Sequence, residues 1–476
     1  MSGKPTPRPR QPNLDTVTTI GEDGSRYFLH PSDVGGRWTT ARRAVAAVLL
    51  LVFVLLPWIP VNGHPALFLD VERRQFHLFG LTLVPQDLWV LFFCITGIGF
   101  ALFFATALLG RVWCGWACPY TVFLEHVFRR IERLTDGDAA ARRRLDAAPW
   151  TRAKVARRVV KHGLYLACSA LIAHVFLSYF VSLPRLWSFV LGNPLAHAAA
   201  FGTAAFLTAA LWFCFAWFRE QFCIIVCPYG RIQGALTDDD TVVIGYDAAR
   251  GEPRGRKGRV AGHCIDCRRC VHVCPTGIDI RNGLQLECIG CAACIDACDA
   301  VMDKLGRPRG LVRYDSLTGL AGGRRRLVRP RVVAYAVLGL AGLSLLGVTA
   351  ARRARPFTAS VTRIAGAGAA PFSADAAAVR NIYQVRFLNK RNQPASFTLT
   401  LGPGAPEGFT LAGAGQAVGV EALGEVTRAC VVLVPRAAYA GPADLSLVVT
   451  AKPGPVRLPL KVRFLGPDPG PPAPAR

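Results

Sequence analysis

Five long apolar stretches constrain the fold of this chain more than any other feature. They cover residues 44–60, 88–110, 163–183, 195–218 and 332–350. A helix needs about 20 apolar residues to cross a bilayer core, and these stretches approach or exceed that length. About 40 mostly polar residues precede the first stretch and no small-residue cleavage site follows it, so a cleaved signal peptide is not expected. We therefore expect a multidomain membrane protein with an α-helical bundle of about five transmembrane spans.

Basic residues are concentrated in alternate connections between these stretches. Residues 1–43, 111–161 and 219–331 are rich in Lys and Arg, whereas the two intervening loops contain only Arg73, Arg74 and Arg185. The positive-inside rule then places the N-terminus and both basic connections in the cytoplasm, and the C-terminal region outside. This distribution also accounts for the net charge of +25. The lipid bilayer is thus an expected partner, and nucleic acid is not.

Eight cysteines form the most specific motif in the chain. The run Cys264-x2-Cys267-x2-Cys270-x3-Cys274-Pro recurs as Cys288-x2-Cys291-x2-Cys294-x3-Cys298. In bacterial two-cluster ferredoxins, the fourth cysteine of each such run ligates the other cluster. One [4Fe-4S] cluster is therefore assigned to Cys264, Cys267, Cys270 and Cys298, and a second to Cys288, Cys291, Cys294 and Cys274. Zinc sites use two pairs of ligands, and cytoplasmic thiols stay reduced, so zinc and disulfides are disfavoured.

Four further cysteines follow the second and fourth apolar stretches. They form two CxxxCP motifs, Cys114-x3-Cys118-Pro and Cys223-x3-Cys227-Pro, which indicate a duplicated helical hairpin. If each motif is helical, its two thiols share one face. Four soft thiolates suit Cu(I), so these residues are candidate catalytic and copper-binding residues. The alternatives are a dithiol that cycles between redox states, and small residues that pack at helix ends.

The remaining cysteines and the histidines give weaker signals. Cys94, Cys168 and Cys214 lie inside apolar stretches, where a free cysteine packs as a small hydrophobe. Cys430 is expected to be buried in the C-terminal domain. No histidine pair has a clear haem spacing, so haem is not favoured.

The pattern changes after residue 352. Short Val-, Leu- and Phe-rich segments at 382–388, 396–401, 430–434, 445–450 and 456–464 are separated by turn signals, which predicts a β-sandwich. A basic stretch, 250–262, links the membrane and cysteine-rich units. The expected parts are an N-terminal cytoplasmic segment (1–43), a four-span membrane unit (44–235), a cytoplasmic ferredoxin-like domain with two clusters (236–330), a fifth span (331–351), an outer β-sandwich domain (352–465) and a disordered Pro-rich tail (466–476).

The order of these motifs resembles the FixG/CcoG family of cytochrome c oxidase accessory proteins. The resemblance rests on the two CxxxCP motifs, both cysteine runs, and the segments 246–255 and 381–390, and it extends from about residue 27 to about 464. Tyr120 departs from the family pattern, because many members have Gln after the first CxxxCP.

The resemblance implies a multi-pass protein of the bacterial inner membrane with an immunoglobulin-like periplasmic domain. It also implies a role in assembling a cbb-type haem–copper oxidase, in which Cu(II) is reduced to Cu(I) near Cys114, Cys118, Cys223 and Cys227. The implied partners are oxidase assembly factors and an unidentified electron donor. Two alternatives remain: a quinol-linked electron-transfer ferredoxin of a periplasmic reductase system, and a non-catalytic assembly scaffold or copper chaperone.

Overall fold

The computed structural model describes residues 19–20, 25–83, 88–255, 262–353, 357–364, 371–391, 393–413, 415–454 and 456–467. The chain forms two compact units, Met1–Leu346 and Gly347–Arg476. Most of the predicted tail, and residues 256–261 of the predicted linker, lie outside the described residues.

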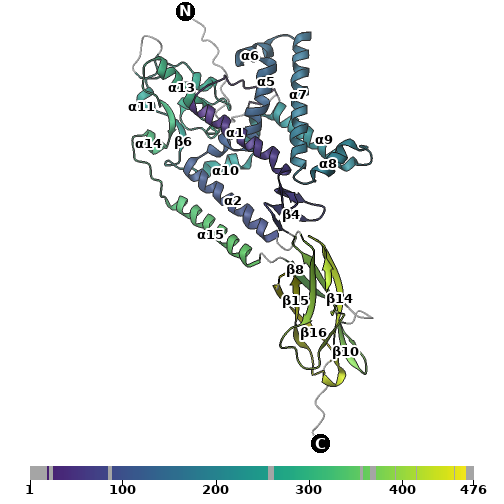
Figure 1. The fold of residues 1–476 in the computed structure, drawn as a ribbon. Coiled ribbons are helices and arrows are strands. Elements are labelled where there is room, and N and C mark those ends of the chain that lie inside the picture. The colour runs from purple at the N-terminus through teal and green to yellow at the C-terminus, as the bar shows by residue number, and fades with distance from the viewer. Residues whose placement is uncertain are drawn as a thin grey trace, which may run out of the picture. The chain divides into compact units, whose positions relative to one another are not determined.

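Five long helices confirm the predicted apolar stretches (Figure 1). They are α1 (Arg37–Leu55), α2 (Leu88–Leu109), α7 (Arg152–Leu177), α9 (Ala198–Phe213) and α15 (Pro330–Arg353). By length and composition, each could cross a membrane. The third helix begins well before residue 163, because the Thr151 side chain accepts a hydrogen bond from the Lys154 amide and caps it.

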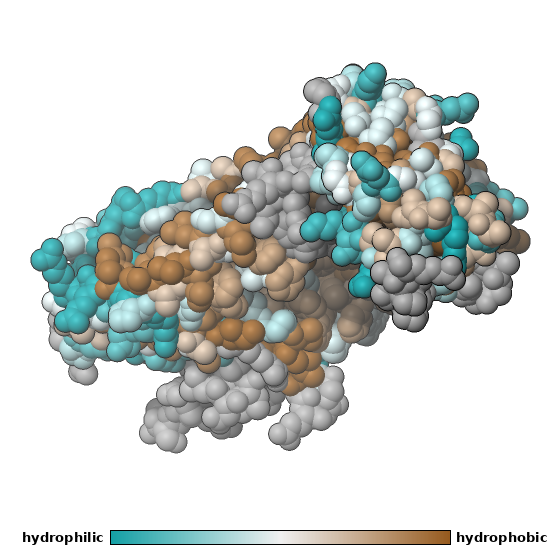
Figure 2. Space-filling view, turned by 90° about the horizontal axis from the view of Figure 1, so that it is seen from below, coloured by the Kyte–Doolittle hydropathy of each residue, from teal (hydrophilic) through white to brown (hydrophobic). Residues whose placement is uncertain are grey.

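These helices expose large apolar side chains, and contact between such side chains and water is unfavourable. Leu51, Ile98, Phe206 and Leu340 are all more than half exposed, and brown apolar surface covers a broad part of Figure 2. An apolar surface this extensive fits contact with lipid tails.

The connection between α1 and α2 contains strands that the sequence did not predict. Strands β1 (Pro60–Val61) and β2 (His64–Pro65) pair, and β3 (Leu67–Asp70), β4 (Gln75–Leu78) and β5 (Leu81–Leu83) form an antiparallel sheet. These strands are too short to show a clear alternating pattern.

Short helical segments fill the other connections of the first unit. Between α2 and α7 lie α3 (Val112–Trp116), α4 (Pro119–Phe123), the π-helix η3 (Leu124–Phe128), α5 (Arg129–Asp136) and α6 (Ala139–Ala147). Helix α8 (Leu183–Leu191) joins α7 to α9. The π-helix η4 (Cys214–Phe218) extends α9, and the short segments η5 (Phe222–Val226) and α10 (Pro228–Leu236) follow it.

The cysteine-rich region folds around two helices and a two-stranded sheet. The helices are α12 (Arg269–His272) and α13 (Ala293–Lys304), and strand β6 (Val243–Tyr246) pairs with β7 (Val312–Asp315). Its smaller helices are α11 (Ala248–Gly251), η6 (Ile280–Asn282) and α14 (Leu317–Leu320). Ile244, Ile280, Met302 and Leu311 form the buried centre. The Thr39 amide near the start of α1 donates to Asp296 Oδ2 in α13, at 2.7 Å, so this region is fastened to the first long helix.

The second unit is the predicted β-sandwich. One sheet has the order β12-β14-β10-β8 with β9 beside β10, and the other has the order β13-β11-β15-β16. The strands are β8 (Phe357–Ile364), β9 (Ser373–Ala374), β10 (Ala378–Asn389), β11 (Ala395–Leu401), β12 (Thr410–Ala412), β13 (Val418–Val420), β14 (Glu425–Pro435), β15 (Ala443–Lys452) and β16 (Val456–Phe464). Alternate residues of β10 and β15 are buried, as in an antiparallel sandwich. Cys430 is buried in the core between the sheets, as predicted.

Candidate metal centres

The eight ferredoxin-type thiols gather in two groups. Cys298 in α13 interacts electrostatically with Cys267 and Cys264, and Cys270 interacts with Cys298. Cys294 interacts mainly with Cys291, Cys288 and Cys274, and more weakly with Cys270 of the first group. The last cysteine of each run therefore lies beside the other run, because α12 and α13 carry the fourth thiol away from the loop that holds the first three.

The second group lines a pocket of about 320 Å³. Its thiols are Cys274, Cys288, Cys291 and Cys294, with Cys270 of the first group also at its wall, and its apolar lining includes Ile278, Ile280 and Ile289. Soft sulfur donors in an apolar shell fit an iron–sulfur cluster.

The spacing of the thiols also bears on the type of centre. Within the described ranges, no three His, Cys, Asp or Glu side chains lie close enough to hold one metal ion. Two thiolates on a single ion are separated by no more than about twice a metal–sulfur bond of roughly 2.3 Å. In a cubane, each thiolate binds a different iron atom, so the four thiols lie farther apart. The assignment of these thiols to clusters therefore rests on the doubled cysteine run rather than on this spacing.

Each CxxxCP motif is interrupted rather than continuously helical. Cys114 lies in α3 and Cys223 in η5, but Cys118 and Cys227 are the N-cap residues of α4 and α10, with extended ψ angles of 122° and 112°. The expectation of one helical face for each pair is therefore wrong. The following proline disfavours helical geometry at the second cysteine, and itself begins the next helix.

The four CxxxCP thiols nevertheless lie near one another. Cys223 interacts electrostatically with Cys118, Cys114 and Cys227. Burial raises the pKa of the Cys114 thiol to about 12, although the Arg111 guanidinium lowers it, and burial also raises the pKa of Cys223. Such thiols are protonated at neutral pH and react slowly as nucleophiles. Because both disulfide exchange and metal binding require the thiolate, either reaction must first remove these protons.

The first CxxxCP motif packs directly on the second ferredoxin run. A Cβ atom on Gly115 would lie 2.5 Å from the Ile289 carbonyl oxygen, so only glycine fits this contact. The Trp116 indole N–H donates to the Gly290 carbonyl at 3.3 Å, and the Tyr314 hydroxyl donates to the same oxygen at 2.5 Å. Cys114 belongs to the hydrophobic cluster that contains Cys288 and Cys291.

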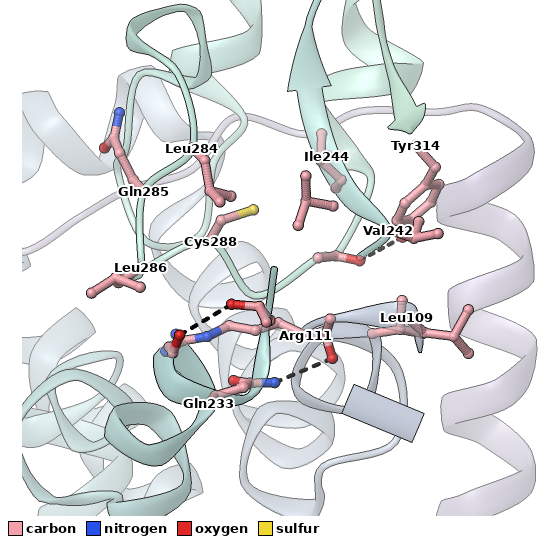
Figure 3. A pocket seen from close by; sticks show the side chains of 16 residues that line it. Leu109, Arg111, Gln233, Val242, Ile244, Leu284, Gln285, Leu286, Cys288 and Tyr314 are labelled. Carbon is pink, nitrogen blue, oxygen red and sulfur yellow. Dashed lines mark hydrogen bonds between the residues drawn. The ribbon is translucent and has the colours of Figure 1, made fainter. Parts of the chain in front are cut away.

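A cleft of about 450 Å³ opens beside this contact (Figure 3). Leu109, Leu284 and Leu286 contribute apolar surface, while Arg111, Gln233, Cys288 and Tyr314 contribute polar atoms. Gln233 Nε2 donates to the Gly110 carbonyl at 3.2 Å, and Gln233 Oε1 lies 3.9 Å from Cys114 Sγ. The cleft thus lies between the CxxxCP thiols and a ferredoxin-type cysteine.

Buried ion pairs join the two helical hairpins, and sequence reasoning missed them. Glu132 Oε2 in α5 accepts hydrogen bonds from Arg219 and Arg142, both at 3.1 Å. Arg129 Nη2 lies 3.2 Å from Glu220 Oε2 and donates to the Pro275 carbonyl at 3.0 Å. The sequence signal for these ion pairs was the presence of charged residues after the fourth span, at Arg219 and Glu220, and after the first CxxxCP motif, at Arg129 and Glu132. Such charges are ordinarily solvated, so this signal is weak.

Comparisons with known proteins agree with this architecture. The family model described as "4Fe-4S dicluster domain" matches residues 218–317, "4Fe-4S binding domain" matches residues 90–136, and an "IG-like fold at C-terminal of FixG" matches residues 347–467. The second match includes Cys114 and Cys118.

Three curated relatives are similar over much of the chain. Protein RdxA of Cereibacter sphaeroides is 36% identical over 79% of this chain and 82% of its own length. Protein RdxB of the same organism is 35% identical over 82% and 84%, and the nitrogen fixation protein FixG of Rhizobium meliloti is 40% identical over 62% and 58%. With two 4Fe-4S domains, membrane-type helices and the FixG C-terminal fold, this chain belongs to the FixG/Rdx family of iron–sulfur electron-transfer membrane proteins.

Proposed function

We propose that this protein reduces Cu(II) to Cu(I) for the assembly of a cbb-type haem–copper oxidase. Two [4Fe-4S] clusters would be ligated by the two groups of ferredoxin-type thiols described above. Copper, the substrate, would bind at the group of thiols Cys114, Cys118, Cys223 and Cys227; no three of these described side chains converge on one point, so the ion would engage two thiolates or draw the others toward it. The basic connections support a cytoplasmic location for the N-terminus and the ferredoxin-like domain, and a periplasmic location for the sandwich.

One observation carries this proposal: the contact between Gly115 and the backbone of the second cysteine run. It makes the first CxxxCP motif a direct neighbour of the proposed cluster ligands Cys288 and Cys291. Electron transfer between centres in such contact needs no large movement of the protein.

The thiol group supplies selectivity for the product. Soft thiolates stabilise Cu(I) relative to Cu(II), and copper must displace the protons that the buried thiols hold. The clusters, when bound, supply electrons singly. Each Cu(II) takes one electron, which an electron donor outside this chain must replace, and Cu(I) is the product.

The experiment uses the purified full-length protein under anaerobic conditions, with its clusters reduced. We expect Cu(II) to reoxidise the clusters and to form Cu(I), which a Cu(I)-specific chelator detects. Replacing Cys114 and Cys223 with Ser should abolish Cu(I) formation while the iron content stays unchanged. Cys94→Ser, in the same membrane unit, is the matched control and should retain activity. Full activity in the Cys114/Cys223 variant would refute a role for these thiols.

A second candidate function is oxidation of quinol, and the cleft beside Cys288 favours it. Its apolar walls could accept a quinone ring, and Tyr314 and Gln233 could hydrogen-bond the ring oxygens. Under this proposal, a soluble quinol analogue would reduce the clusters, and Leu284→Trp would prevent the reduction by filling the cleft. Quinol reduction that is insensitive to this substitution would exclude the cleft.

A third candidate is an assembly scaffold or copper chaperone in which the clusters have no redox role. The Cys264→Ser/Cys267→Ser variant separates it from the first proposal. Normal oxidase assembly in cells that carry this variant would favour the scaffold, whereas loss of assembly with a stably folded variant would favour the reductase.

A further inference from the structure

A second cavity, of about 660 Å³, is lined by none of the cysteines described above. The first turns of α1, the π-helix η3 and α5 form most of its wall, together with Pro275 and Ala293 from the cysteine-rich region. Pro275 follows Cys274, and Ala293 precedes Cys294. The cavity therefore borders the backbone that carries two ligands of the proposed second cluster. None of the four CxxxCP cysteines lines it.

The cavity is strongly cationic. Its only lining carboxylates within the described chain are Asp33 and Glu125, whereas six arginines line it: Arg42, Arg43, Arg129, Arg130, Arg133 and Arg142. Glu125 pairs with both Arg42 and Arg129, Arg129 also pairs with Glu220 outside the lining, and Arg133 pairs with Asp33. Arg142 pairs with Glu132, which lies outside the lining.

Two of these arginines are in excess of the carboxylates. Arg43 Nη2 donates to the Val34 backbone carbonyl at 3.5 Å, and no salt bridge joins Arg43 to a described residue. Burial and the Arg43 charge lower the pKa of Arg130, although Asp33 and Glu125 act in the opposite direction. His126 also lines the cavity, and burial and the Arg42 charge lower its pKa to about 4, so it is neutral at pH 7.

Buried donors in the cavity wall lack acceptors. The Nε atoms of Arg42, Arg129 and Arg142 are buried and have no hydrogen-bond partner within the part of the chain that the structure describes. Their side chains are only 8%, 7% and 4% exposed. A buried donor without an acceptor costs free energy, and three such donors from three different segments surround one cavity.

We propose that this cavity binds the phosphate group of an anionic ligand, which can be a phospholipid headgroup or a soluble phosphate compound. A phosphate carries enough charge to balance Arg43 and Arg130, and its oxygens accept several hydrogen bonds from guanidinium groups. Arginine is well suited to phosphate because its planar donors match the geometry of the oxyanion. The ligand would lie beside the backbone that carries Cys274 and Cys294.

The test uses the full-length protein with its clusters, freed of native lipid and placed in phosphatidylcholine nanodiscs. One arm measures binding of inorganic pyrophosphate by calorimetry. The other arm measures retention of phosphatidylglycerol by native mass spectrometry after exchange into nanodiscs that contain it. Saturable binding of pyrophosphate identifies a soluble ligand class, and selective retention of phosphatidylglycerol identifies a lipid.

The variants are chosen to leave the fold intact. Arg43 and Arg130 are exposed at their outer parts and lie outside the buried ion pairs, so Arg43→Gln/Arg130→Gln should keep its iron content. We expect it to weaken binding in the productive arm by at least about tenfold, since it removes two cationic donors of charge-assisted hydrogen bonds. The exposed Arg144 lies outside the cavity, and Arg144→Gln should bind normally. Absence of saturable binding in both arms, or equal weakening by Arg144→Gln, would overturn the proposal.

Discussion

Gly115 lies so close to Cys291 that a Cβ atom on the glycine would be 2.9 Å from the Cys291 backbone nitrogen. The first CxxxCP motif therefore depends on a glycine to approach the second cysteine run. Gly115→Ala would force α3 away from this run, at a cost of about 1–3 kcal/mol for overpacking. We expect a lower melting temperature and slower reoxidation of the clusters by copper.

Gly163 in α7 provides the control for this substitution, because nothing lies within 4 Å of a Cβ atom there. Gly163→Ala should leave the reoxidation rate unchanged. If both variants behave alike in stopped-flow measurements, the close contact at Gly115 has no role in electron transfer.

Asp296 caps α1 from a distance in sequence. Its carboxylate accepts hydrogen bonds from the Thr39 amide and hydroxyl, both at 2.7 Å, while the N-cap residue Gly36 has no side chain to do so. Asp296→Ala should cost about 1–2 kcal/mol, as loss of an N-cap does, and should speed hydrogen exchange at the start of α1. Asp303→Ala, in the exposed last turn of α13, should not change this exchange. Unchanged protection in Asp296→Ala would argue against the capping role.

Glu132 is the centre of the buried ion pairs between the hairpins. Burial alone would raise its pKa, but the charges of Arg219 and Lys161 hold the pKa at about 2. Glu132→Gln would leave buried arginines without their partner, so we expect a loss of about 3–5 kcal/mol in stability. The exposed Glu72, which pairs with Arg185, is the control, and Glu72→Gln should cost less than about 1 kcal/mol.

The pH dependence of this effect has a definite sign. A depressed pKa stabilises the fold above the unfolded value of about 4.3, and this stabilisation is lost only as pH falls toward the folded value of about 2. The difference in melting temperature between wild type and Glu132→Gln should therefore stay constant from about pH 8 to pH 5.5. A difference that shrinks steadily across this interval would show that the carboxylate titrates there instead.

The fourth cysteine of each run is assigned to the cluster of the other run, and this assignment predicts the iron content of cysteine variants. Cys264→Ser and Cys298→Ser should remove the same cluster, so each should lose about four of about eight irons, and the double variant should lose no more. Cys264→Ser with Cys274→Ser should lose nearly all the iron, because these residues are assigned to different clusters. Iron analysis and EPR would detect the opposite result, in which Cys298→Ser removes the cluster of Cys288.

The spans and the sandwich could be read from local sequence patterns, but their details could not. The helix α7 begins at Arg152 because Thr151 caps it, although the apolar stretch begins later. Strands β1 to β5 were missed because each has only two to four residues, too few to display an alternating pattern. The interruption of each CxxxCP motif follows from the proline after the second cysteine, a local signal that could have been used.

The sequence by itself determined the membrane helices, the two cysteine runs and the C-terminal sandwich, because hydropathy and ligand spacing are properties of neighbouring residues. Tertiary packing was needed to show that Gly115 contacts Cys291, that four CxxxCP thiols gather, and that arginines of α1, α5 and α6 line one cavity. These features join segments far apart in the chain. Their formation depends on which helix faces pack together, and packing is governed by the shape and charge of both partners rather than by either segment alone.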